Sequence, residues 1–261
     1  MSALHVQGHV YLIGAGPGDP DLLTVRALRL IEQAEVVVHD RLVSPEIMAL
    51  VPEGAQRIDV GKAPDHHPFP QANINALLVS LASRGSKVVR LKGGDPYMFG
   101  RGSEEVAELR TAGISYTVVP GITSAQGIAS ATGVPLTHRG LATGVRFVTG
   151  HCRAGHELDL AWAGLADPET TLAVYMGRGH AAEIAARLIG AGLPADMPAM
   201  LVVDGTRASE EQHFTTLDHL GEVAAGLDAK RPVLMMIGQV VTLADALAVR
   251  EAAALERVGH G

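Results

Sequence analysis

The sequence predicts an α/β protein with two α/β domains, each built on a mostly parallel sheet with helices on both faces. Three observations predict it: short apolar runs alternate with longer segments of helical period, Gly- and Pro-rich turns separate them, and the pattern restarts after a low-charge stretch. We expect the domain junction near residues 121–137 and divide the chain into domains of residues 1–124 and 125–261. A cleft between the two domains is the expected active site.

In the first half, aliphatic and β-branched runs predict strands at residues 9–13, 36–38, 57–60, 87–92 and 116–119. Segments of helical period predict helices over residues 22–34, 71–83 and 103–112, with one more beginning at Ser44-Pro45. Ser44 followed by Pro45 indicates a helix start, because serine caps the first turn and proline fits its first position. Gly113 is expected to end the helix before it.

The second half repeats the pattern. Strands are predicted at residues 145–149, 172–176, 199–203 and 233–237, and helices over about 181–190, after Leu217, and over 243–255. The segment 120–124 is expected to end a strand in a turn and to open a helix of small residues, whose first amides and hydroxyls suit polar ligand atoms.

Composition excludes several classes of protein. Of the 261 residues, 47% are hydrophobic, 19% charged and 3% aromatic, and the net charge is −7, so neither the basic footprint nor the stacking platform of a nucleic-acid binder is expected. The longest stretch without a charged residue, 111–138, contains Pro120 and Pro135, so no membrane span is predicted. The scattered histidines show no metal-ligand spacing, and we expect no metal site.

The single cysteine, Cys152, cannot form an internal disulfide, which indicates a reducing cytoplasm. The first ten residues lack the basic and apolar regions of a secretory signal, so we expect the mature chain to begin there. Charge is uneven along the chain: 14 Lys and Arg face 13 Asp and Glu up to Arg153, and 7 face 15 beyond it. The front half is therefore expected to meet an anionic ligand more readily.

The loop of residues 14–18, GAGPG, follows a predicted strand and suggests three interpretations. A dinucleotide site is disfavoured, because the third glycine of G-x-G-x-x-G is replaced by Asp19 and because Pro17 and Pro20 delay the helix. A plain tight turn is the second. The favoured one is a ligand edge lined by main chain, where side chains must be small.

A second Gly-rich edge, Lys92-Gly93-Gly94-Asp95-Pro96, also follows a strand. Adjacent glycines let main chain approach a flat ligand, and Asp95 can accept hydrogen bonds from hydroxyls or an ammonium group. Two turns with an aspartate cap are the simpler alternative. Because ligands bind at the carboxyl ends of strands in open α/β sheets, we expect both loops to line one site.

Charged residues follow two further strands, as Asp40-Arg41 and as Gly61-Lys62. An acid, a guanidinium and an ammonium at strand ends can transfer protons and bind carboxylates, although charges at loop starts often serve only solubility.

Taken in order, six segments resemble one family. They are VYLIGAGPGDPDLL at 10–23, VVVHDRLVS at 36–44, VGK at 60–62, VRLKGGDPYMFGRG at 89–102, VPGITSA at 119–125 and TGH at 149–151. Together they resemble the tetrapyrrole methylases over about residues 10–241, and the GGDPxxFGRG and DRLVS segments are specific to that family.

The resemblance implies two α/β domains around a cleft, a homodimer, and S-adenosyl-L-methionine as methyl donor, with S-adenosyl-L-homocysteine released. The implied reaction methylates uroporphyrinogen III at C2 and C7, giving precorrin-1 and then precorrin-2 for siroheme or cobalamin biosynthesis. The first domain would carry substrate and cofactor loops, and the second would add cofactor contacts.

Site residues also follow from the resemblance. The base and acid fall on Asp40 and Lys62. The implied cofactor contacts are Pro17, Gly93, Gly94, Asp95, Met98, Thr123, Ser124, Met176 and Gly205. Because the excess of acidic residues lies beyond Arg153, we expect the substrate carboxylates to bind cationic side chains of the front half. These are Arg41, Arg101, Arg139 and Arg153, as well as Lys62. One segment departs from the family pattern of Arg-x-Gly-x-His after Gly61-Lys62: residues 63–67 read APDHH here.

Three alternatives share parts of this pattern. A sister enzyme acting on a later corrin intermediate, or a diphthine synthase, would have the same cofactor loops. A nicotinamide-dependent dehydrogenase would need residues 14–18 to hold a pyrophosphate, and a regulator would bind the methyl donor without turnover.

Overall fold

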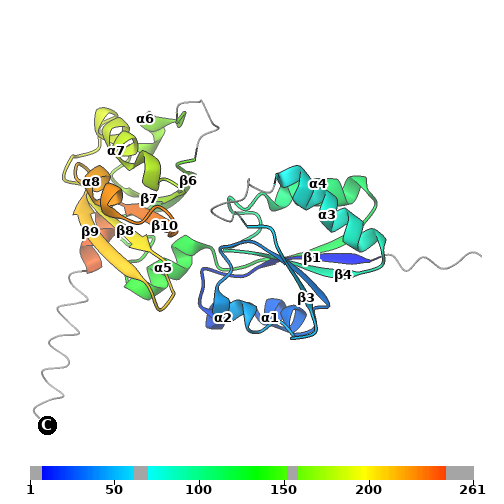
Figure 1. Ribbon diagram of the computed structural model, residues 1–261. Coiled ribbons are helices and arrows are strands. Elements are labelled where there is room, and N and C mark those ends of the chain that lie inside the picture. The colour runs from blue at the N-terminus through cyan, green and yellow to red at the C-terminus, as the bar shows by residue number, and fades with distance from the viewer. Residues whose placement is uncertain (1–7, 62–69, 152–157, 245–261) are drawn as a thin grey trace, which may run out of the picture. The chain divides into compact units, whose positions relative to one another are not determined.

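The computed structural model describes residues 8–61, 70–151 and 158–244 (Figure 1). By internal contacts the chain divides into two compact units, Met1–Ser124 and Ala125–Gly261. Each unit contains a five-stranded sheet with helices packed against it. The predicted α/β class is therefore confirmed, while the cleft expected between the domains stays a prediction.

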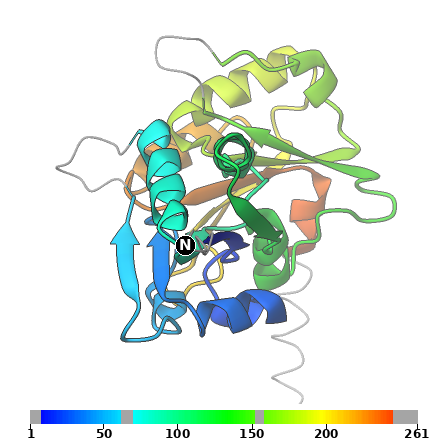
Figure 2. The same cartoon turned by 90° about the vertical axis from the view of Figure 1, so that its right-hand side faces the viewer.

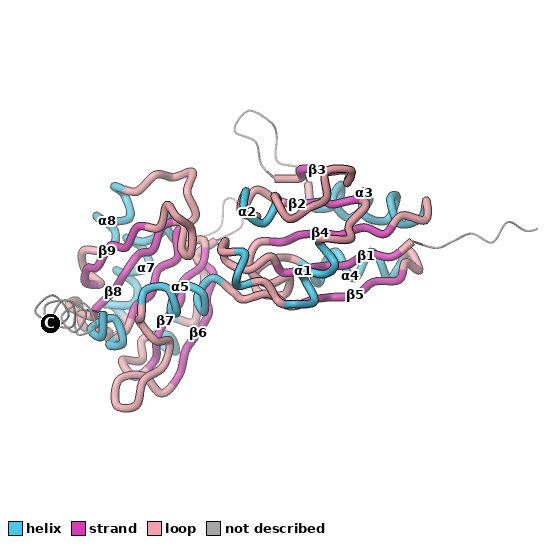
Figure 3. The backbone as a smooth tube through the Cα atoms, turned by 90° about the horizontal axis from the view of Figure 1, so that it is seen from below, coloured by secondary structure: helices cyan, strands magenta, loops and turns pink. Residues whose placement is uncertain are grey.

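The sheet of the first unit is entirely parallel. Its strands are β1 (His9–Gly14), β2 (Val36–His39), β3 (Gln56–Asp59), β4 (Lys87–Lys92) and β5 (Ser115–Val119). They lie in the order β3-β2-β4-β1-β5, which Figure 3 shows as a row of strands. Because all five run the same way, their carboxyl ends reach one edge of the sheet.

Helices cover both faces of this sheet, as Figures 1 and 2 show for α1 and α3. The helical elements are η1 (Pro20–Leu22), α1 (Val25–Ile31), α2 (Pro45–Met48), α3 (Gln71–Ser83) and α4 (Gly102–Thr111). Side chains alternate along a strand, so Leu12 packs with α3 and α4 while Ile13 packs with α1 and α2. The helix predicted over 22–34 is split, because Thr24 caps a new helix by accepting a hydrogen bond from the Ala27 amide.

The second unit has a mixed sheet. Its strands are β6 (Gly144–Thr149), β7 (Thr170–Tyr175), β8 (Pro198–Val203), β9 (Glu211–Thr216) and β10 (Val233–Ile237), in the order β6-β7-β10-β8-β9. β6 and β7 are parallel, whereas β10 is antiparallel to both neighbours and β9 is antiparallel to β8. The prediction of a mostly parallel sheet is wrong for this unit, because β9 returns directly from β8 and β10 inserts between β7 and β8.

The helices of this unit also divide between the two faces of its sheet. They are α5 (Ser124–Thr132), α6 (Trp162–Leu165), η2 (Arg178–His180), α7 (Ala181–Gly190), α8 (Leu220–Gly226) and η3 (Gln239–Thr242). One buried cluster joins α6, α7 and α8 to the sheet through side chains such as Leu172 and Leu201, and another joins α5 through Ile128 and Met200. Most of the helix predicted over 243–255 lies outside the described residues. Within the described part of the chain, every helix is too short or too polar to cross a membrane.

Candidate functional site

The carboxyl edge of the first sheet brings together most of the residues predicted for a site in this unit. Loops after four strands contribute to it. After β1 comes Pro17; after β2, Asp40 and Arg41; after β4, Gly93, Gly94, Asp95 and Met98; after β5, Thr123 and Ser124. This is the edge at which open α/β sheets bind ligands.

Glycines allow three of these loops to touch main chain to main chain. The Gly16 amide donates to the Gly94 carbonyl at 3.1 Å, and the Gly94 amide donates to the Gly16 carbonyl at 2.7 Å. A Cβ atom at Gly121 would lie 2.3 Å from the Gly94 carbonyl oxygen, and one at Gly14 would lie 2.4 Å from the Gly121 nitrogen. Gly14 and Gly121 are therefore needed for packing. Gly94, at φ 68°, has its Cβ position open, with Ser124 Oγ 3.9 Å away.

Asp95 joins two loops through its carboxylate. Oδ1 accepts a hydrogen bond from the Tyr97 amide at 2.8 Å, and Oδ2 accepts one from the Gly121 amide at 3.1 Å. The sequence predicts that this carboxylate accepts from ligand hydroxyls or an ammonium group. In the structure its partners are main-chain amides, so Asp95 also holds the loops after β4 and β5 together.

Backbone strain is concentrated in the same loops and in two loops of the second unit. Among the described residues, those other than glycine with positive φ are Phe99, Arg101, Met176, Asp204 and Thr206. They follow β4, β7 and β8. Such conformations cost on the order of 1–3 kcal/mol each and persist where surrounding structure enforces them, often at functional sites.

Arg101, one of the predicted substrate ligands, forms a two-pronged ion pair with Glu104. Its Nε and Nη2 atoms lie 2.8 and 2.7 Å from Oε1 and Oε2 of Glu104. This hydrogen bonding raises the pKa of Arg101 and lowers the pKa of Glu104. Both side chains are more than half exposed, so the Arg101 guanidinium reaches solvent while it remains paired with the Glu104 carboxylate.

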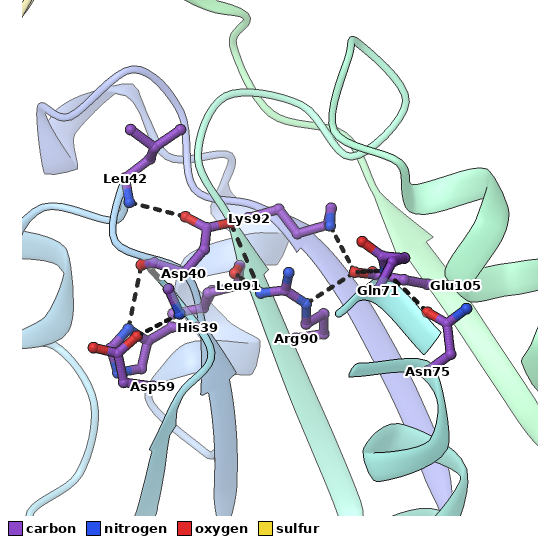
Figure 4. Close-up of polar contacts among 11 residues, drawn as sticks. His39, Asp40, Leu42, Asp59, Gln71, Asn75, Arg90, Leu91, Lys92 and Glu105 are labelled. Atoms are coloured by element: carbon purple, nitrogen blue, oxygen red, sulfur yellow. Dashed lines mark hydrogen bonds and ion pairs between the residues drawn. The ribbon is translucent and has the colours of Figure 1, made fainter. Parts of the chain in front are cut away.

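Asp40 is the partly exposed member of a group of charged side chains that is otherwise buried (Figure 4). Its Oδ1 accepts a hydrogen bond from the Leu42 amide at 3.0 Å, and its Oδ2 lies 3.8 Å from Nη1 of Arg90. Behind Arg90, Oε1 of Glu105 lies 3.2 Å from Nε of Arg90 and 2.8 Å from Nζ of Lys92. The Asp40 side chain is 26% exposed, whereas those of Arg90, Lys92 and Glu105 are at most 4% exposed.

The same Glu105 oxygen also accepts a hydrogen bond from Gln71 Nε2 at 3.3 Å. Burial, followed by the positive charge of Arg90, lowers the pKa of Lys92 against the attraction of Glu105. Sequence reasoning missed this charge group. The available signal was the strand Lys87–Lys92, in which Arg90 and Lys92 stand two apart after the apolar pair Val88-Val89 and so share one face.

In the second unit, Met176 and Gly205 reach one edge of the sheet. β7 and β8 are both antiparallel to the strand between them, so their carboxyl ends lie on the same side. Met176 is 51% exposed at φ 55°. A Cβ atom at Gly205 would lie 2.3 Å from Cγ1 of Ile128, so this glycine is also explained by packing on α5.

Among the predicted cationic residues, Arg139 lies away from the edge of the second sheet that carries Met176 and Gly205. Arg139 is exposed in the turn of residues 138–142, next to the amino end of β6 rather than the carboxyl ends of β7 and β8. Lys62 and Arg153 lie outside the described residues. Across residues 8–61, 70–151 and 158–244, no three His, Cys, Asp or Glu side chains are grouped so that they could hold a metal ion.

Comparison with known proteins identifies the family of the chain. Residues 9–221 match the family model described as Tetrapyrrole (Corrin/Porphyrin) Methylases. A uroporphyrinogen-III C-methyltransferase of Paracoccus denitrificans is 55% identical over 238 residues, which cover 91% of this chain and 83% of that protein. A crystal structure of uroporphyrin-III C-methyl transferase from Thermus thermophilus, complexed with S-adenyl homocysteine, superposes with a TM-score of 0.77 at 40% identity, covering 90% of this chain and 94% of that one.

A longer relative matches equally far along the chain. The siroheme synthase of Pseudomonas aeruginosa is 51% identical over 246 residues, which are 94% of this chain and 53% of that protein. The chain thus spans about half the length of that relative.

Proposed function

Because this chain belongs to the tetrapyrrole methylase family, we propose that it transfers methyl groups from S-adenosyl-L-methionine to uroporphyrinogen III. Methylation at C2 gives precorrin-1, and methylation at C7 then gives precorrin-2 for siroheme or cobalamin biosynthesis. The observation that carries the proposal is the 55% identity to the Paracoccus enzyme, which extends along 83% of that protein. The Thermus relative bound to S-adenyl homocysteine supports the choice of methyl donor.

The predicted cofactor residues at the carboxyl edge of the first sheet, and those after β7 and β8 of the second sheet, fit the methyl donor. At Gly94 the Cβ position is open, so main chain can approach a flat adenosine group, and Thr123 and Ser124 supply hydroxyls nearby in the sequence. Met176 presents an exposed thioether in a strained conformation, which packing alone does not require. Pro17, Gly93, Asp95, Met98 and Gly205 complete the proposed set. The donor supplies a methyl group already activated by its positive sulfonium.

Asp40 is the proposed base. Substitution at a pyrrole carbon forms a carbon–carbon bond to the methyl group and requires a proton to leave the macrocycle. The Asp40 carboxylate is partly exposed at the carboxyl edge, which supports this role. Lys62, in a segment outside the described residues, is the proposed acid or carboxylate ligand.

Substrate binding is proposed for the cationic side chains Arg41, Arg101, Arg139 and Arg153. Uroporphyrinogen III carries eight carboxylates, which an arginine can bind with two parallel hydrogen bonds. Arg41 follows the proposed base directly and is exposed. Holding substrate and donor together can supply roughly 7–11 kcal/mol of the barrier, so positioning accounts for much of the expected rate. We further propose a cytoplasmic homodimer.

The test is product analysis. Purified protein is incubated anaerobically with uroporphyrinogen III and methyl-labelled S-adenosyl-L-methionine, and the product mass and visible absorption are followed. The proposal predicts two added methyl groups and a dipyrrocorphin-type spectrum. Binding of S-adenosyl-L-homocysteine without methyl transfer to this substrate would contradict it and would point to a later corrin intermediate.

A further inference from the structure

We propose that Arg90 is a positioning residue for this reaction: its buried guanidinium orients the Asp40 carboxylate, and Glu105 fixes the guanidinium. The inference rests on the proposed function, because it explains how the proposed base is held. It concerns Arg90 of β4 and Glu105 of α4, to which the sequence alone assigns no role.

The Arg90 guanidinium is fixed on two sides before it meets Asp40. Its Nε lies 3.2 Å from Oε1 of Glu105, and its Nη1 donates a hydrogen bond to the Leu91 carbonyl at 2.8 Å. Because the guanidinium is planar, these two contacts set the orientation of the whole group. The side chain is 3% exposed, so bulk water screens its charge weakly.

Asp40 is then held through both carboxylate oxygens. The Leu42 amide binds Oδ1 at 3.0 Å, and Nη1 of Arg90 lies 3.8 Å from Oδ2. A separation of 3.8 Å exceeds hydrogen-bond length, so the attraction is Coulombic and orients Oδ2 without occupying it. Oδ2 therefore keeps its lone pairs for a proton, as a base requires.

Register explains why these side chains meet. Val38 of β2 is paired with Arg90 of β4, and alternate residues of a strand share a face, so Asp40 continues β2 on the face of Arg90 and Lys92. The same face packs against α3 and α4, which brings in Glu105. Figure 4 shows this line of side chains from Asp40 through Arg90 to Glu105.

The charges of the group also favour this role. With all members ionised, Arg90 and Lys92 carry two positive charges and Glu105 one negative charge. Burying an uncompensated charge is costly, and the second negative charge comes from Asp40. Asp40 is also the member that reaches solvent, at 26% exposure, so the buried cations hold a carboxylate where a substrate can meet it.

The experiment is a double-mutant cycle in the full chain with Asp40→Asn, Arg90→Gln and both together. We expect Arg90→Gln to lower kcat by about 10- to 100-fold, because misplacing a reacting group by about 1 Å costs as much, while the Kd of S-adenosyl-L-homocysteine stays unchanged. In the Asp40→Asn background, Arg90→Gln should cost no further activity, because residues acting through one group are not additive. Arg90→Lys, which keeps the charge, should restore part of kcat.

Activity at lowered temperature separates positioning from folding. Glu105 stays 2.8 Å from Lys92 when Arg90 is replaced, so Arg90→Gln keeps one buried ion pair and can be assayed well below its own Tm. A merely structural role would recover kcat there, whereas positioning predicts that kcat stays low. Arg57→Gln is the matched control, because Arg57 lies in the same sheet and donates to the Val51 carbonyl at 2.8 Å. Its kcat should equal that of the wild type.

Several results would overturn the inference: wild-type kcat in Arg90→Gln or in Asp40→Asn, or an equal loss from Arg90→Gln in both backgrounds. If the wild-type chain transfers no methyl group to uroporphyrinogen III, the proposed function fails first, and the role of Arg90 falls with it.

Discussion

Met176 has a backbone conformation that lowers the stability of the folded protein. Its backbone is left-handed at φ 55°, its thioether is 51% exposed, and it follows the carboxyl end of β7. A left-handed conformation costs a residue with a side chain roughly 1–2 kcal/mol relative to glycine. Because the methionine side chain is exposed, packing does not compensate for this cost. A contact with the ligand explains the left-handed conformation better.

Met176→Gly should therefore separate stability from binding. We expect the free energy of unfolding to rise by up to about 1 kcal/mol, because glycine adopts positive φ without strain, while the affinity for S-adenosyl-L-homocysteine falls. Chemical denaturation and calorimetric titration measure the two quantities. Met176→Ala is the control: it also removes the thioether but keeps the strain, so affinity should fall without any gain in stability. Unchanged affinity in both variants would count against the cofactor contact.

At this scale the sequence predicts residue types better than their contacts. Asp40, Gly94 and Asp95 lie where the loops after predicted strands should place them. Glu105, by contrast, belongs to an amphipathic helix, and its meeting with Arg90 and Lys92 depends on how α4 packs on the sheet, which local periodicity does not determine.

At the scale of elements, the short helix α2 depends on one buried hydroxyl. Ser44 Oγ accepts a hydrogen bond from the Ile47 amide at 3.3 Å as the helix cap and donates one to the Gly18 carbonyl at 2.6 Å. It thereby ties the loop after β1 to the loop after β2. A four-residue helix has little stability of its own, so the cap matters more than in a long helix.

Ser44→Ala should lower the free energy of unfolding by about 1–3 kcal/mol, since it removes a cap and leaves a buried carbonyl unpaired. It should also weaken S-adenosyl-L-homocysteine binding, because Pro17 lies in the tethered loop. Urea unfolding and calorimetric titration test both effects. Thr24→Ala, which removes the cap of α1 at 3.1 Å, should cost stability but leave binding intact. Equal binding losses in the two variants would contradict the tether.

The sequence predicts the elements of the first unit within a few residues but misses β9 in the second. β9, with sequence EQHFTT, lies at the edge of its sheet and is mostly exposed or half-buried, so it lacks the apolar alternation of a buried strand. The sequence does not predict the direction of β10 either, because an apolar run does not reveal whether its neighbouring strands are parallel or antiparallel.

At the scale of the whole molecule, charge is distributed unevenly. The net charge of −7 comes from the part beyond Arg153, where 15 acidic residues face 7 basic ones. The front part is near neutral, and it contains Asp40 and Arg41 at the carboxyl edge of the first sheet. We therefore expect this part of the chain to attract a substrate with many carboxylates, although the protein is acidic overall.

This distribution predicts a selective effect of salt. Raising ionic strength from about 0.05 to 0.5 M shortens the screening length to a few ångströms, so the KM for uroporphyrinogen III should rise severalfold. The KM for S-adenosyl-L-methionine, whose proposed contacts are mainly main chain and hydroxyls, should change little. Steady-state kinetics with each substrate varied in turn would measure this, and parallel rises in both KM values would argue against arginine-bound carboxylates.

The most direct test of the site compares wild type and Asp40→Asn in anaerobic reactions with uroporphyrinogen III and labelled methyl donor. Asparagine preserves the shape of the side chain but cannot accept the proton, and general bases contribute typically about 10²–10⁴-fold. We predict dimethylated product from the wild type, a loss of that order in the variant, and equal affinity of both for S-adenosyl-L-homocysteine. Dimethylated product from Asp40→Asn at the wild-type rate would show that the reacting centre is not at this carboxylate.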